Sequence, residues 1–161
     1  MKKLRIYLDT SVISYLDAQD APEKMADTFR LWEQILDGRY NVVLSDVVFD
    51  ELNDCEQKKR SVLLACIGRI NYDMAEENSD ALAIARRFID FGILTKKSLS
   101  DCRHIAAALV SGCDVITSWN FKHIVNDKTI NGTKAIVAAE GYKDIIICTP
   151  AMLIREGFDN D

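Results

Sequence analysis

The sequence lacks long apolar runs, and it has little proline or glycine. No window approaches the ~18 uninterrupted apolar residues that a membrane-spanning helix needs, so no membrane association is expected. The chain has two prolines and seven glycines, and it contains no low-complexity segment, linker or internal repeat. Its 161 residues, 48% of them hydrophobic, are enough for one sizeable core. We therefore expect a single domain over residues 1–155 and a short acidic tail at 156–161.

Paired cysteines and a leader segment are also absent. The five cysteines are scattered, odd in number and without the CxxC spacing of metal ligands, which is typical of reduced, mostly buried thiols. Met1, Lys2 and Lys3 lead directly into a predicted strand and not into the apolar region of a signal peptide. Both observations predict a cytoplasmic protein.

The chain has no excess of positive charge. Its net charge of −5 argues against a protein that binds nucleic acid through a broad basic face. The same charge is compatible with a nuclease, because bound divalent cations reverse the local sign of an acidic site.

Short, continuous, β-branched runs predict four strands, at residues 4–8, 41–45, 114–118 and 145–148. A fifth short strand is expected at 69–73. Apolar strands of this kind, separated by helical segments, form a parallel sheet that is covered on both faces. The sequence thus predicts an α/β domain with three layers, α/β/α, around a central parallel sheet of four to five strands.

Apolar residues at three- and four-residue spacing predict the helices between these strands. The expected helices cover 25–36, 46–57, 61–70, 78–91 and 98–111, and a further one follows Thr149-Pro150. Ser98 and Asp101 resemble a capping box at the start of the fifth helix. Phe29 and Trp32 belong to an apolar stripe that is typical of a core-facing helix, and part of it is also suited to a subunit interface.

Acidic and amide side chains stand beside the predicted strand ends. Asp9 closes the first strand, Glu51 lies on the helix after the second, Asp101 opens the long helix before the third core strand, and Asn120 follows that strand. Groups beyond the carboxyl ends of parallel strands converge on the crevice where the strand order reverses. We therefore expect these four residues to meet at one edge of the sheet.

Each acid taken alone also has a purely structural interpretation. Asp9 is placed to cap the helix that begins near Thr10 and Ser11. Glu51 is suited to a solvated helical face, and Asp101 is a favourable first-turn acid for a helix dipole. Their joint placement favours a site instead, because like charges gathered closely cost several kcal/mol unless they are protonated or bridged by a cation.

Hard oxygen ligands of this kind suit Mg²⁺ or Mn²⁺. An acidic crevice that holds such a cation is a phosphodiester-hydrolysis site in outline. His104 and His123 have no third histidine or paired cysteine beside them, so a zinc site is not expected and both are interpreted as structural or as hydrogen-bond partners of the ligands.

Five segments in order resemble the PIN domains, and among them the VapC-like toxin ribonucleases of VapBC toxin–antitoxin pairs. They are "YLDTSVI", "FDEL", "LSDCRHIAAAL", "ITSWNFKHI" and "ICTPAML", and together they span nearly the whole chain. The resemblance implies an endoribonuclease that depends on Mg²⁺ or Mn²⁺, with an RNA substrate, an antitoxin partner and a homodimeric state.

The family's four acidic positions fall on Asp9, Glu51, Asp101 and position 120 of this chain. The first three are the implied metal ligands, and all four are the implied catalytic residues. Position 120 departs from the family, which often has aspartate there, whereas this chain has Asn120. An amide oxygen can ligate a hard cation, but it brings no charge and cannot act as a base.

Two alternatives to the nuclease remain open at this point. A PIN-like module that binds RNA or protein through an impaired metal site is supported only by Asn120. A receiver domain or a dehalogenase-type phosphatase would share the α/β fold and the acid after the first strand. The phosphatase pattern needs a second aspartate two residues after Asp9, where this chain has Ser11, and a receiver needs paired acids, where Leu8 and Asp9 offer one.

Overall fold

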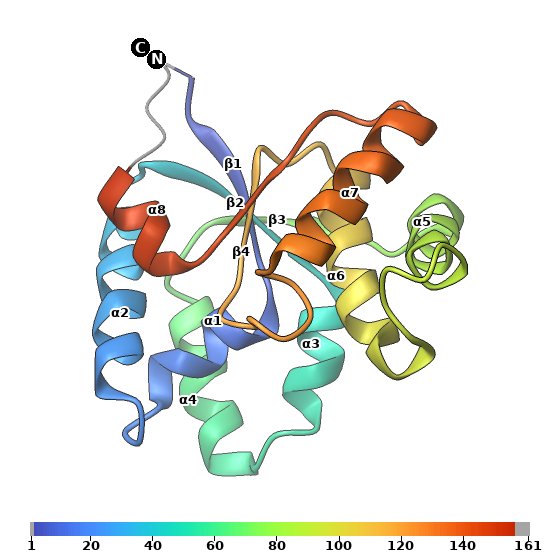
Figure 1. The fold of residues 1–161 in the computed structure, drawn as a ribbon. Helices are drawn as coiled ribbons and strands as arrows, with labels where there is room; N and C mark the ends of the chain where they lie inside the picture. Colours follow the sequence, from blue (N-terminus) through green and yellow to red (C-terminus); the bar gives the residue numbers. More distant parts are fainter. Residues whose placement is uncertain (1, 157–161) are drawn as a thin grey trace.

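The fold is built on a single five-stranded parallel sheet. A computed structural model describes residues 2–156, and its strands have the spatial order β3-β2-β1-β4-β5 (Figure 1). The strands are β1 Leu4–Leu8, β2 Tyr40–Ser45, β3 Tyr72–Ala75, β4 Val115–Thr117 and β5 Ile146–Cys148. The four principal strands agree with the prediction, while the fifth lies a few residues later than the predicted 69–73.

Helices cover both faces of this sheet. Helices α2 and α8 lie on one side, and α5, α6 and α7 lie on the other (Figure 1). The helices are α1 Thr10–Ser14, α2 Pro22–Leu36, α3 Asp46–Asn53, α4 Gln57–Ile67, α5 Ser79–Asp90, α6 Leu99–Val110, α7 Asp127–Glu140 and α8 Pro150–Glu156, with 3-10 turns η1 Tyr15–Asp17 and η2 Lys96–Ser98. The three-layer α/β/α architecture is confirmed.

Several predicted helix boundaries need correction. The helix expected over 46–57 ends at Asn53, and the next begins at Gln57. The capping box predicted for Ser98 is wrong, because its side chain makes no capping hydrogen bond to α6. The cap at Thr149 is confirmed, since its hydroxyl accepts a hydrogen bond of 3.2 Å from the Met152 backbone N–H. The predicted tail lies outside the described residues except for Glu156, which ends α8.

The first strand occupies the centre of the sheet. Strand β1 pairs with β2 on one side, where Ile6 lies opposite Val42, and with β4 on the other, where Ile6 lies opposite Val115. The chain adds β2 and β3 in one direction from β1 and then adds β4 and β5 in the other. The strand order therefore reverses at β1, and the carboxyl ends of β1 and β4 flank the position where parallel sheets place their ligands.

Helix α7 packs against the loop after α5 through a glycine. A Cβ atom added to Gly132 would lie 2.7 Å from three side-chain carbons of the buried Ile93. Two of these carbons are attached directly to the branched Cβ of Ile93, so they have little freedom to move aside. The close approach of α7 therefore depends on the missing side chain at position 132.

We expect Gly132→Ala to destabilise the protein by about 1–3 kcal/mol, because overpacking outweighs the gain of up to ~1 kcal/mol in helix propensity. Urea unfolding monitored by circular dichroism measures the change. The matched control is Gly132→Ala combined with Ile93→Ala, which should lose less stability than the two single changes added together. A Gly132→Ala protein more stable than the wild type would contradict this packing.

Candidate active site

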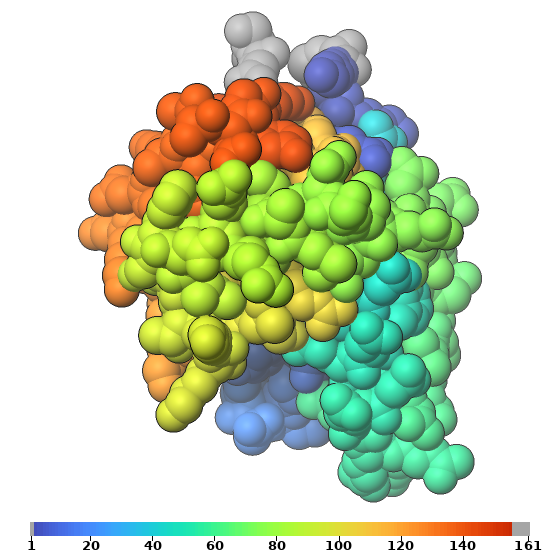
Figure 2. All heavy atoms as spheres, turned by 90° about the vertical axis from the view of Figure 1, so that its right-hand side faces the viewer, coloured from blue at the N-terminus to red at the C-terminus, as the bar shows by residue number. Residues whose placement is uncertain are grey.

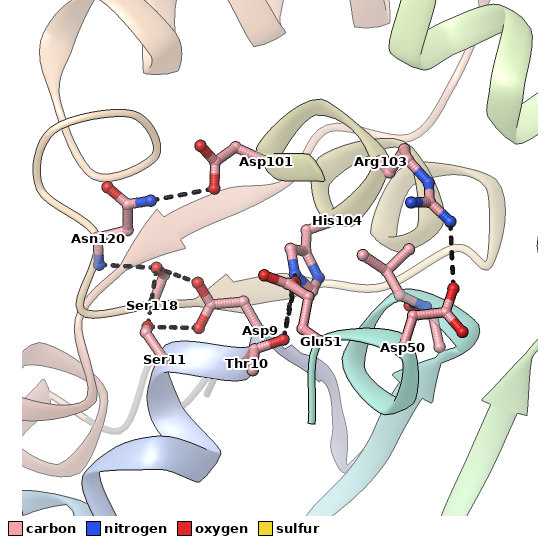
Figure 3. A network of polar contacts seen from close by, with 12 residues as sticks. Asp9, Thr10, Ser11, Asp50, Glu51, Asp101, Arg103, His104, Ser118 and Asn120 are labelled. Atoms are coloured by element: carbon pink, nitrogen blue, oxygen red, sulfur yellow. Dashed lines mark hydrogen bonds and ion pairs between the residues drawn. The ribbon is translucent and has the colours of Figure 1, made fainter. Parts of the chain in front are cut away.

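The backbone places Asp9 at the carboxyl end of β1 and Ser118 and Asn120 just beyond the end of β4. Asp9 also caps α1, because its Oδ1 accepts a hydrogen bond of 3.2 Å from the Val12 backbone N–H. Helix α3 carries Glu51, and the first turn of α6 carries Asp101. Figure 3 shows the side chains of all three acids directed toward the same region at this edge of the sheet.

The Asp9 carboxylate is buried and held by two hydroxyl groups. Ser11 donates a hydrogen bond of 2.6 Å to Oδ1, and Ser118 donates one of 2.5 Å to Oδ2 (Figure 3). Burial raises the pKa of Asp9, and the His104 ring and the two hydroxyls offset that rise only in part. Asp9 is thus a carboxyl group whose ionisation is costly in the folded protein.

The charges of the other two acids affect the pKa of Asp101. Burial raises the pKa of Asp101, and the negative charges of Asp9 and Glu51 raise it further, while His123 and His104 oppose the rise. The Asp101 carboxylate is therefore repelled by the other two, although the three acids come from three separate segments of the chain. A bound cation would relieve that repulsion.

Glu51 is held by a histidine. Its Oε1 contacts Nε2 of the buried His104 and accepts a hydrogen bond of 2.9 Å from the Thr10 hydroxyl. Burial alone would raise the pKa of Glu51, but the contacts with His104 and Thr10 lower it below its usual value. Of these three acids, Glu51 therefore has the pKa that is lowered, whereas those of Asp9 and Asp101 are raised.

The buried Tyr7 fixes the other side of the His104 ring. Its hydroxyl lies 2.7 Å from His104 Nδ1 and 2.7 Å from Ser45 Oγ. A continuous polar chain thus runs from Ser45 through Tyr7 and His104 to Glu51. These contacts orient His104, as the interpretation of this residue as a partner of the acids expects.

Asn120 contacts Asp101 through its nitrogen and not through its oxygen. Its Nδ2 donates a hydrogen bond of 3.1 Å to Asp101 Oδ1, and its Oδ1 accepts one of 2.9 Å from the His123 backbone N–H. The backbone N–H can only donate, so it fixes which end of the amide faces Asp101. In this conformation Asn120 orients Asp101, and an aspartate at position 120 would instead place a second negative charge beside it.

The structure thus brings all four predicted site residues to one edge of the sheet. Ser118 is not singled out by the sequence, although a hydroxyl residue directly after a strand beside the strand-order reversal is a recognisable signal. Two neighbouring acids pair with Arg103 instead: its guanidinium lies 2.8 Å from Glu77 and 3.5 Å from Asp50, and Figure 3 shows the contact with Asp50.

The donor chemistry of this edge suits a hard cation, because carboxylate oxygens are the ligands that Mg²⁺ and Mn²⁺ prefer. Within residues 2–156, however, no group of three or more His, Cys, Asp or Glu side chains is arranged as a metal site. In the described conformation Glu51 contacts His104, and Asp101 contacts Asn120. A cation would have to compete with these two contacts.

Helices α3 and α5 lie on the same face of the molecule. Figure 2 shows this face, with the lime and yellow atoms of residues near 90–105 above and the teal atoms of α3 beside them. Between them the surface is hollowed, and blue atoms of the N-terminal segment are visible at the bottom (Figure 2).

None of the helices within the described residues is both long and apolar enough to cross a membrane.

Comparisons with known proteins identify the fold. The chain is similar in structure to VapC20 from Mycobacterium tuberculosis, a toxin described as cleaving the sarcin-ricin loop, with a TM-score of 0.57 and 17% sequence identity, over 88% of this chain and 98% of that one. It is also similar to a chain of VapBC2 from Rickettsia felis, solved bound to a promoter DNA fragment, with a TM-score of 0.56 and 12% identity, over 91% of this chain and 98% of that one.

No family model matches the sequence, and the search of curated proteins gave no match. The structural likeness nevertheless extends over most of both chains in each comparison. The protein therefore has the PIN-domain fold of VapC toxins, as the five sequence segments predicted.

Proposed function

We propose that the protein is a metal-dependent endoribonuclease and the toxin of a type II toxin–antitoxin pair. The observation that carries the proposal is the meeting of Asp9, Glu51 and Asp101 at the strand-order reversal, where the charges of two of them raise the pKa of the third. The VapC-like fold supports the same activity.

In the proposed site, Asp9 and Asp101 hold the cation, and Glu51 helps to hold it and to orient the attacking water. A bound Mg²⁺ or Mn²⁺ supplies an activated water and stabilises the negative charge that develops on the phosphate. Ser11 and Ser118 keep the Asp9 carboxylate fixed, so it needs little reorganisation when substrate binds.

Two further residues of the chain have positioning roles in this proposal. Asn120 holds the Asp101 carboxylate through its amide nitrogen. His104 holds Glu51 from the opposite side and is itself held by Tyr7. Water attack at the phosphate, with the 3′ oxygen as the leaving group as the resemblance to PIN domains implies, would leave a 3′-hydroxyl and a 5′-phosphate.

We extend the proposal to partners and location by analogy. One of the similar structures is a VapBC complex, which supports a cognate antitoxin for this chain, and a homodimer is proposed on the same likeness. On helix α2, Phe29 remains 42% exposed and is available to a partner, whereas Trp32 is buried in the core. Within residues 2–156, none of the cysteines forms a disulfide, which suits a reducing cytoplasm.

Cleavage of RNA by the purified chain tests this function. With Mg²⁺ or Mn²⁺ present, we expect cleavage of an end-labelled RNA of mixed single-stranded and hairpin regions, and we expect EDTA to abolish it. The new 5′ ends should be phosphorylated, which a 5′-phosphate-dependent exonuclease detects. RNA binding without cleavage in either cation would instead favour the alternative, a PIN-like binding module with an impaired metal site.

A further inference from the structure

An ordered group of aromatic rings and one lysine lies directly beside the acidic site. The ring centroids of Tyr15 and Trp119 are 6.0 Å apart, and those of Trp119 and Phe121 are 6.5 Å apart. The Lys24 ammonium lies 5.4 Å from the Tyr15 centroid, 5.7 Å from that of Trp119 and 5.5 Å from that of Phe121. We call these four residues the aromatic–lysine cluster.

The centre of the cluster is rigidly held. Trp119 is buried, and its indole N–H donates a hydrogen bond of 2.9 Å to the hydroxyl of the buried Thr28. Its backbone N–H donates another of 2.9 Å to Ser11 Oγ, the same hydroxyl that donates to Asp9. Ser11 therefore links the cluster to the Asp9 carboxylate.

Phe121 is the accessible part of the cluster. Its side chain is 51% exposed, although the residue directly follows Asn120, which holds Asp101. One of its neighbours is the Lys24 cation, whose attraction to the three rings fixes a positive charge beside the exposed ring. An exposed aromatic face and a fixed ammonium therefore stand together, next to the residues proposed to cleave RNA.

This pairing matches the chemistry of a single-stranded nucleotide. Every nucleobase has a face that stacks on an aromatic ring, and every nucleotide carries a phosphate that a lysine can contact. The chain has a net charge of −5, so general attraction to the RNA backbone is weak and local contacts must supply the affinity. We infer that the aromatic–lysine cluster binds the unpaired nucleotide next to the cleaved phosphate, with its base on Phe121 and its phosphate at Lys24.

This inference rests on the proposed function, but binding tests it separately from cleavage. Anisotropy of a labelled ten-nucleotide single-stranded RNA, measured in EDTA, reports contacts that need no cation. We expect Phe121→Ala to weaken binding about tenfold, within the range for loss of one stacked base, and Phe121→Trp to retain it. We expect Lys24→Met to weaken binding and to reduce the salt dependence by about one phosphate contact.

Matched controls separate the cluster from general surface effects. Phe91 is 56% exposed at the end of α5, and Lys58 is exposed on α4. Phe91→Ala and Lys58→Met should bind the RNA as the wild type does. Equal losses in the Phe91 and Phe121 variants would overturn the inference, and so would wild-type binding by Phe121→Ala.

Cleavage kinetics complete the test. Phe121→Ala should raise KM with little change in kcat, since the ring stacks on a base and does not contact the bond that breaks. If the wild type binds single-stranded RNA through Phe121 but cleaves none in any cation, the proposed function fails while the nucleotide site stands. If the wild type cleaves RNA and Phe121→Ala has an unchanged KM, the inference fails while the proposed function stands.

Discussion

Replacing Asp101 by asparagine should reduce cation-dependent RNA cleavage at least about 100-fold and leave the fold intact. Loss of a mere hydrogen-bond partner of a metal ligand typically costs 10–100-fold, and Asp101→Asn removes a charged ligand itself. Burial and the charges of Asp9 and Glu51 raise the pKa of Asp101, so neutralising it removes repulsion from the folded protein. The initial rate of cleavage of an end-labelled RNA measures the effect.

Asp80→Asn is the matched control. Asp80 lies in the first turn of α5, as Asp101 lies in the first turn of α6, but Asp80 is exposed whereas Asp101 is half-buried. The Asp80 variant should cleave at the wild-type rate. An Asp101→Asn protein that cleaves as fast as the Asp80→Asn protein would remove Asp101 from the site.

A cation and the Asp9→Asn change should each stabilise the folded protein, but their effects should not add. A cation at 100 times its Kd adds about 2.7 kcal/mol to the free energy of unfolding, which raises Tm by about 5–10 °C for a chain of this size. Without a cation, Asp9→Asn should also raise Tm, because it removes a buried charge. The variant should then lose most of the response to Mg²⁺ or Mn²⁺.

The difference in stability between Asp9→Asn and the wild type should change with pH in one direction. The pKa of Asp9 is raised in the folded state. The contribution of Asp9 to the free energy of unfolding is therefore favourable below the unfolded pKa, and it is lost as the pH rises through the folded pKa. The advantage of Asp9→Asn over the wild type should therefore be small in acid and grow toward neutral pH. Calorimetry in EDTA and in Mn²⁺ over a pH series measures both effects, and an identical cation response in the two proteins would argue against Asp9 as a ligand.

Strands β1, β2, β4 and β5 could be predicted closely from the sequence because they are continuous apolar runs, whereas the prediction for the exposed β3 lies a few residues too early. Helix α7 could not be predicted, since it has few apolar residues on its packed face. Thr129 and Thr133 are buried there, and Gly132 contributes no side chain, so the helical period of apolar residues is weak. The packing that stabilises α7 depends on Ile93, which lies far away in the sequence.

Some residues of the candidate site could likewise be placed from the sequence, and the contacts of others could not. Asp9 and Asn120 can be placed from sequence because each follows a recognisable strand. The hydrogen bond from Ser118 to Asp9 joins residues 109 positions apart, and that from Tyr7 to His104 joins residues 97 apart. Neither pairing leaves a local pattern. The orientation of the Asn120 amide likewise depends on a turn that brings the His123 N–H to its oxygen.

The central place of β1 has a consequence for synthesis of the chain. Asp9 leaves the ribosome early, yet the Ser118 hydroxyl that holds it follows β4, whose Val115 pairs with Ile6. Domains form during translation only when their long-range partners have emerged. A nascent chain that ends before β4 therefore carries the first acid without the strand that completes its surroundings. Under the proposed function, a ribosome making this toxin would be shielded from it until most of the chain had been translated.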